Sequence, residues 1–243
     1  LPLLLGLTWV CRRFLDRRSL AGMGLGSPRL PWISLIPLAL FAGGLPIAAG
    51  VAILTATGRL GFAGLQLPPM AFYVTPMFIG AAFVEELIFR GYIQSNLMER
   101  GRVILAVTIS AVLFGLVHSF NPGVWKSTVS MLNLIVAGVL LAVVYLWSQD
   151  LWFPTVMHFA WNATQGVVFG IPVSGMQING VIKTQMQAGP VDPLTGGSFG
   201  LEGSVIILGL QFVMIGVFVW LYRRRQQDET DLNPGLPPVP PEQ

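Results

Sequence analysis

The sequence predicts an all-α protein, a polytopic bundle of transmembrane helices. Of its 243 residues, 53% are hydrophobic and only 10% are charged, and the mean hydropathy is +0.70. A soluble domain is about a quarter charged, so the composition excludes an ordinary soluble enzyme. Cys11 is the only cysteine, which excludes an intramolecular disulfide and a cysteine-based zinc site.

About seven apolar membrane segments are expected, several of them kinked or broken. The chain begins without Met inside the first segment, so we expect part of that helix to be missing. Pro37, Pro46 and Gly43-Gly44 predict kinks in the second segment, and Asn121-Pro122 ends the fourth. The expected segments are residues 1–11, 32–57, 70–98, 103–119, 128–147, 152–170 and 203–222.

Two stretches lack this apolar character. Residues 171–202 are rich in Gly, Pro, Thr and Gln, which predicts a long polar loop. Residues 226–243 are acidic and then proline-rich, which predicts a disordered cytoplasmic tail. Residues 1–225 are therefore expected to form one integral membrane domain.

Arginine clusters predict the orientation. They follow the first, third and seventh segments, and with alternating crossings they all fall on one side, which the positive-inside rule assigns to the cytoplasm. The net charge of +3 therefore reflects topology, and we expect no nucleic-acid partner. The clusters are Arg12, Arg13, Arg17 and Arg18, then Arg100 and Arg102, then Arg223, Arg224 and Arg225.

Glu85 and Glu86 stand side by side in the apolar segment 70–98. A charged side chain at membrane depth costs about 2.5–3.5 kcal/mol on insertion scales, so the pair indicates catalysis, ion translocation or a buried ion pair. Arg90 has the i,i+4 spacing of an ion pair with Glu86, but one arginine does not neutralise both carboxylates. Glu85 points about 100° away around the helix. It is our candidate general base or acid.

The chain's two histidines also lie in apolar segments. His118 shares a helix face with Phe114, although a single histidine near a helix end is most often a capping or interfacial residue. His158 shares a face with Asn162, and this pair could stabilise an oxyanion or form an interhelical clamp worth about 0.6 kcal/mol. We expect one water-accessible cavity to collect the polar side chains Glu85, Glu86, His118, His158 and Asn162.

In order and spacing, Glu85-Glu86-x-x-x-Arg90, Phe114-x-x-x-His118 and His158-x-x-x-Asn162 resemble the motifs of the CPBP family. These are CAAX-type prenyl endopeptidases and their bacterial abortive-infection relatives. The resemblance covers roughly residues 70–170. It implies an intramembrane endopeptidase in the bacterial cytoplasmic membrane. The implied partners are membrane lipid and a peptide or protein substrate, which can itself be membrane-anchored.

Carried over to this sequence, the resemblance assigns a role to each motif residue. Glu85 activates the attacking water, with Glu86 assisting it or held by Arg90. His118 places or activates the water, and His158 and Asn162 stabilise the oxyanion. Arg90 and Phe114 support the site.

Three questions stay open at this stage. Glu85, His118 and His158 could present a zinc ligand set, but the sequence lacks His-Glu-x-x-His, and we favour a metal-independent glutamate mechanism without a cofactor. Asn133 is expected to face the bundle, more often as a structural hydrogen bond than as a site residue. The alternatives to a peptidase are a proton- or cation-coupled transporter and a non-catalytic membrane scaffold.

Overall fold

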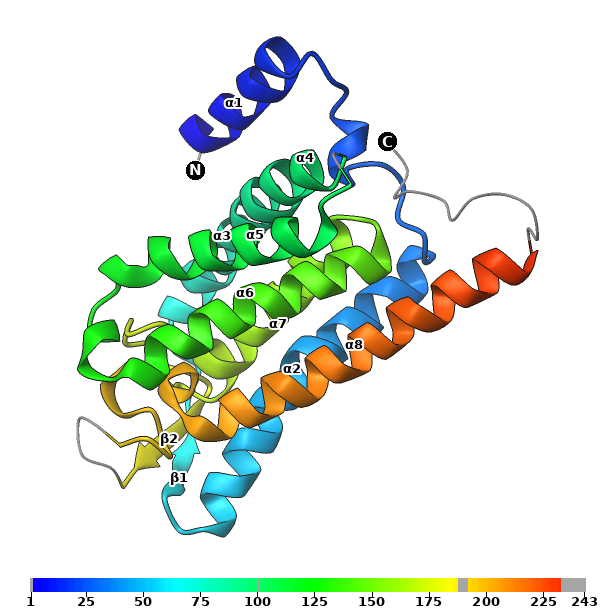
Figure 1. The fold of residues 1–243 in the computed structure, drawn as a ribbon. Coiled ribbons are helices and arrows are strands. Elements are labelled where there is room, and N and C mark those ends of the chain that lie inside the picture. The colour runs from blue at the N-terminus through cyan, green and yellow to red at the C-terminus, as the bar shows by residue number, and fades with distance from the viewer. Residues whose placement is uncertain (1, 100, 188–191, 233–243) are drawn as a thin grey trace.

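The computed structural model describes residues 2–99, 101–187 and 192–232. It confirms the all-α class. Figure 1 shows α2, α6, α7 and α8 side by side, with α5 packed against α6 and with α1 standing apart at one end. The helices are α1 (Pro2–Val10), α2 (Trp32–Ala56), α3 (Met70–Glu86), α4 (Ser95–Met98), α5 (Val103–Val117), α6 (Thr128–Ser148), α7 (Trp152–Asn162) and α8 (Val205–Leu232).

Three helices pass into π-helical turns rather than ending sharply. Cys11–Leu15 extends α1, Leu87–Gln94 joins α3 to α4, and Ala163–Val168 continues α7. Wide turns of this kind are rare and often occur at functional sites. Two of them directly follow Glu86 and Asn162, so they lie where the sequence places its polar motifs.

Among the described residues, five helices are long and apolar enough to cross a membrane, fewer than the seven expected segments. They are Trp32–Ala56, Met70–Met98, Val103–Phe120, Thr128–Ser148 and Val205–Leu232. The expected segments 1–11 and 152–170 correspond to α1 and α7, which are shorter than the roughly 20 residues that span a bilayer. α7 packs against α2 and α3 inside the bundle.

The bundle is built around α6. In the most apolar stretch of α6, 67% of the residues are buried inside the protein, whereas the corresponding share for α8 is 17%. A Cβ on Gly138 would lie 2.8 Å from the Cα of Ala111, so the glycine lets α5 approach α6 closely. Leu140 of α6, Met157 of α7 and Phe218 of α8 share one buried cluster. Large apolar side chains such as Ile33 and Ile104 instead face outward, as lipid contact requires.

The stretch 171–202 is not the plain polar loop that the sequence predicted. Strand β2 (Ile182–Met186) pairs antiparallel with β1 (Leu60–Leu65), which follows α2. Two short 3₁₀ turns, Gly197–Phe199 and Leu201–Gly203, precede α8. Several apolar side chains inside the stretch are buried, among them Ile171, Val173, Phe199 and Leu201. These residues pack against the bundle, so residues 171–187 and 192–202 form a cover over one end of it.

Helix α8 continues past residue 225, where the sequence predicted the start of a tail. α8 runs to Leu232, so residues 226–232 are helical rather than part of a disordered tail. Arg225 and Glu229 pair across one helical turn at 3.0 Å, which supports the extension. The proline-rich residues 233–243 lie outside the described part of the chain.

Arginines of the first cluster have structural partners. Arg12 is buried, pairs with Glu99 at 3.1 Å and donates a hydrogen bond to Asn96. Arg18 also pairs with Glu99. These ion pairs hold the segment after α1 against the end of α4. The sequence analysis assigned Arg12 and Arg18 only to membrane topology and did not predict this structural role.

Candidate active site

Glu86 and Arg90 form a fully buried ion pair at the junction of α3 with the π-helical turn. Arg90 Nη1 lies 3.0 Å from Glu86 Oε1, and both side chains have no exposed surface. Arg90 Nη2 donates a second hydrogen bond to the carbonyl oxygen of Gly138 in α6, at 3.0 Å. The pair therefore fixes α3 against α6 and balances a charge that would otherwise be buried alone.

Gln94 extends this polar stripe by one more turn, and sequence reasoning missed it. Its Nε2 donates to the carbonyl oxygen of Ala142 in α6 at 3.0 Å, one helical turn beyond Gly138. The signal was present, because Glu86, Arg90 and Gln94 recur at every fourth residue on one apolar helix.

His158 connects the ion pair to the second carboxylate. Its Nδ1 lies 2.9 Å from Glu86 Oε1, and since a carboxylate accepts, Nδ1 carries the hydrogen. Its Nε2 then faces Glu85 Oε2 at 3.9 Å. Glu86 thus sets both the orientation and the tautomer of His158 while Arg90 neutralises it.

His118 faces the same oxygen from α5. Its Nδ1 lies 2.7 Å from the carbonyl oxygen of Phe114, which can only accept, so Nε2 is the nitrogen directed at Glu85 Oε2, at 3.7 Å. The Phe114 ring centroid is 4.5 Å from that of His118 and 4.7 Å from the guanidinium carbon of Arg90. Phe114 therefore supports the imidazole on one side and the buried cation on the other.

These groups meet at a cavity of about 250 Å³ between α3, α5, α6 and α7. Four of the five expected residues line it, namely Glu85, His118, His158 and Asn162. Glu86 does not line it, contrary to expectation, because its Oε1 is engaged with Arg90 and His158 behind the cavity wall.

Asn133 is buried in α6 but is also absent from the cavity wall. Its Nδ2 donates to the carbonyl oxygen of Ser204 at 2.9 Å. This bond joins the middle of the bundle to the start of α8.

Glu85, His118 and His158 are the residues that would hold a metal in this site. Glu85 Oε2 and the two Nε2 atoms face one another, yet no group of three or more His, Cys, Asp or Glu within the described ranges has the geometry of a metal centre. The mechanism below therefore takes no step through a metal.

The same cavity holds a second carboxyl beside Glu85, which sequence reasoning missed. Glu202, in the turn before α8, lines the wall together with Ser174. Its Oε2 accepts hydrogen bonds from the backbone N–H and the hydroxyl of Ser174. Burial raises the pKa of Glu202, and the hydrogen bonds from Ser174 oppose this shift. A single glutamate in a glycine-rich stretch carries no sequence signal that separates it from a solvated surface residue.

Comparison with known proteins finds one family match, and it covers the segment that carries the motifs. Residues 67–164 match the family model for type II CAAX prenyl endopeptidase Rce1-like proteins. This segment is similar to the Rce1-like family. It contains all three motifs, from Glu85 to Asn162, and excludes Glu202. No curated protein and no solved structure matches the chain.

The Rce1-like match and the five apolar helices together describe an integral membrane protein of the CAAX-type endopeptidase class. These enzymes are hydrolases whose substrates are peptides or proteins. The match thus supports peptide-bond hydrolysis as the class of reaction. A mechanism has to be argued from the arrangement of side chains around Glu85.

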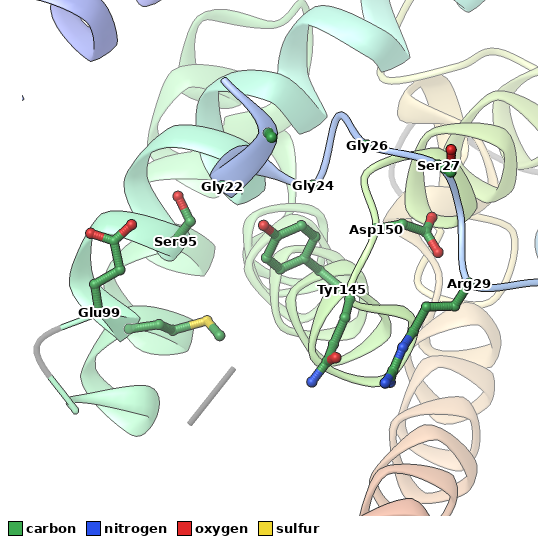
Figure 2. Close-up of a pocket in the computed structure, with 12 residues that line it drawn as sticks. Gly22, Gly24, Gly26, Ser27, Arg29, Ser95, Glu99, Tyr145 and Asp150 are labelled. Atoms are coloured by element: carbon green, nitrogen blue, oxygen red, sulfur yellow. The ribbon is translucent and has the colours of Figure 1, made fainter. Parts of the chain in front are cut away.

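A second cavity, of about 230 Å³, lies under the segment that precedes α2. In Figure 2, Ser95 and Glu99 lie on one side of it and Arg29 and Asp150 on the other. Asp150 is buried, and its Oδ1 accepts the Phe153 N–H in the first turn of α7 at 2.8 Å. This cavity therefore borders the residues that start α7.

Replacing Asp150 separates its hydrogen bond from its charge. Burial raises the pKa of Asp150, so the folded state keeps a proton that the unfolded chain has lost, and wild-type stability falls as pH rises through the raised pKa. Asp150→Asn keeps an acceptor and does not titrate. We measure the thermal midpoint of Asp150→Asn minus that of wild type, both in detergent. We expect this difference to be more positive at pH 8 than at pH 4.

Asp150→Ala is the control, because it removes the acceptor for the Phe153 N–H. It should lower the free energy of unfolding by about 0.5–2 kcal/mol at both pH values. If the difference in thermal midpoint between wild type and Asp150→Asn does not change with pH, the carboxyl of Asp150 titrates normally.

Glu86→Gln should destabilise the fold much more than Glu85→Gln. The first change leaves Arg90 buried without its counter-charge, which typically costs about 3–5 kcal/mol. The second removes a carboxylate that faces the cavity and pairs with no guanidinium. Thermal unfolding of both variants in the same detergent measures the difference. Equal midpoints would mean that the buried pair does not stabilise the bundle.

Proposed function

We propose that this protein is an intramembrane endopeptidase in which Glu85 activates water for attack on a peptide bond. One observation carries the proposal: Glu85 Oε2 faces the Nε2 atoms of His118 and His158 at 3.7 and 3.9 Å, on the wall of a cavity. Glu85 Oε2 accepts no hydrogen bond among the described residues, so its lone pairs are available to a water molecule. A general base must be within hydrogen-bond reach of the proton that it takes.

The two imidazoles would divide the remaining work. His118 donates Nδ1–H to its own helix, so its Nε2 can accept a hydrogen bond from the same water and orient it. In its protonated form His158 has a second N–H at Nε2, and Glu86 stabilises that charge through Nδ1. Nε2–H of His158 and the amide of Asn162 would then donate to the oxyanion of the tetrahedral intermediate.

The cavity wall indicates the kind of substrate. Phe78, Leu141 and Met157 line it beside the polar groups, so apolar side chains next to the scissile bond would be well accommodated. We infer a peptide or membrane-anchored protein that reaches the site from the lipid.

Arg225 donates to the Trp147 carbonyl at the end of α6, and Glu229 pairs with Arg29 ahead of α2, so the last arginine cluster lies at the same end of the bundle as the segment before α2. With that end in the cytoplasm, the C-terminal tail would also be cytoplasmic, and the compartment that we propose is the bacterial cytoplasmic membrane.

Glu85→Gln tests the assignment of the base. The amide keeps the shape of the side chain and cannot take a proton, so kcat should fall by about 10²–10⁴. The measurement is cleavage of an apolar quenched-fluorescence peptide library by purified protein in detergent. Full activity of a folded Glu85→Gln variant would rule out the glutamate mechanism.

The same assay should be run after prolonged treatment with a strong chelator. If the site uses no metal, wild-type activity is retained. Loss of activity that zinc restores would instead assign Glu85, His118 and His158 as ligands, and the step proposed for Glu85 would have to be abandoned.

A further inference from the structure

Glu202 lies on the cavity wall and has no role in the mechanism described so far. It belongs to the turn Leu201–Gly203, outside the segment that matches the Rce1-like family. It lines the same cavity as Glu85, His118 and His158. The chain therefore brings a third carboxyl to a site whose motifs supply two.

The position of Glu202 is fixed by its contacts. Its Oε2 lies 2.5 Å from the backbone N and 2.8 Å from the Oγ of Ser174. Gly200, with φ +91°, packs so tightly on Pro172 that a Cβ there would meet the Pro172 carbonyl oxygen at 1.9 Å. The backbone just before Glu202 is thus held close to the segment that carries Ser174.

The other oxygen of Glu202 is available. Within the described ranges, Oε1 has no hydrogen-bond partner and no arginine or lysine pairs with the carboxyl. The residue is only 8% exposed. Burial raises the pKa of Glu202 because the ionised form loses its hydration, and this outweighs the opposing effects of Ser174, His118 and His158.

The three carboxyls of the site therefore have three environments. Glu86 is neutralised by a guanidinium, Glu85 faces two imidazoles at close range, and Glu202 is held by Ser174 and pairs with no arginine or lysine. Different environments of this kind separate a proton acceptor from a proton donor within one site. Glu85 and Glu202 come from different elements, α3 and the turn before α8, and share one cavity.

We propose that Glu202 is the general acid that protonates the leaving amine. This assignment rests on the proposed function. Glu85 takes a proton from water while the water oxygen bonds to the carbonyl carbon. As the intermediate collapses, the C–N bond breaks and the nitrogen receives the proton of Glu202 Oε1. The proton held by Glu85 then returns to Glu202 through water in the cavity, so the cycle closes without an added reactant.

The simpler explanation is that Glu202 only fastens the turn at Ser174, a non-glycine residue with φ +49°. Glu202→Gln separates the two roles, because the amide oxygen can still accept both hydrogen bonds from Ser174 but the side chain no longer supplies an acidic proton. Thermal unfolding in detergent verifies that the variant is folded.

The experiment compares a peptide substrate with its ester analogue, in which an oxygen replaces the scissile nitrogen. An amine must be protonated to leave, whereas an alcohol leaves more easily without a proton. Glu202→Gln should lower kcat for the peptide by about 10²–10⁴ and for the ester by less than about tenfold. Glu85→Gln should lose both activities, because both need the attacking water. Glu229→Gln, far along α8, is the matched control and should change neither.

Ser174→Ala is the second variant, because it weakens the fastening of the turn and keeps the carboxyl. Its ratio of peptide to ester cleavage should equal that of wild type. Equal losses on both substrates in Glu202→Gln, or a ratio shifted in Ser174→Ala as well, would overturn the assignment in favour of a structural role. If wild type cleaves neither substrate, the peptidase proposal itself fails, and the assignment of Glu202 fails with it.

Discussion

The site depends on the buried pair between Glu86 and Arg90. Glu86 Oε1 accepts from Arg90 Nη1 and from His158 Nδ1, so a single oxygen couples the helix junction to the imidazole of His158. The second nitrogen of Arg90 holds the Gly138 carbonyl of α6. Removing either charge would leave the other buried alone, which is far more costly than the pair itself. The pair thus supports both the packing of α3 and the direction of His158.

This arrangement explains why two adjacent carboxylates are found in one apolar helix. Successive residues of a helix point about 100° apart, so Glu86 faces Arg90 while Glu85 faces the cavity. The neutralised residue orients a histidine, and its neighbour remains free to act on water. Loop residues then complete the cavity, since Ser174 and Glu202 come from the cover that precedes α8. Residues far apart in the sequence thereby form one polar site inside an apolar bundle.

Much of this could be predicted from the sequence, because helical spacing is regular. The apolar runs predicted the helical class, and the i,i+4 spacings brought Glu86 to Arg90 and placed His158 and Asn162 on one face. Gln94 could have been found by the same rule. The tautomers of His118 and His158 could not, because they are set by acceptors such as the Phe114 carbonyl. Glu202 and the β1–β2 pairing depend on long-range contacts through glycine-rich backbone, which leave no periodic pattern.

The central claim is that Glu85 acts on water as a base and does not itself attack the substrate. A single-turnover reaction with excess enzyme in H₂¹⁸O tests this directly, followed by mass spectrometry of the product and of the enzyme peptide that contains Glu85. Direct attack by water predicts ¹⁸O in the new carboxylate of the product and none in Glu85. Nucleophilic attack by Glu85 would form a mixed anhydride with the acyl part of the substrate. It would be seen as a mass increase of the Glu85 peptide, or as ¹⁸O in the Glu85 carboxylate where water opens the anhydride at that carbon, and either result would contradict the account.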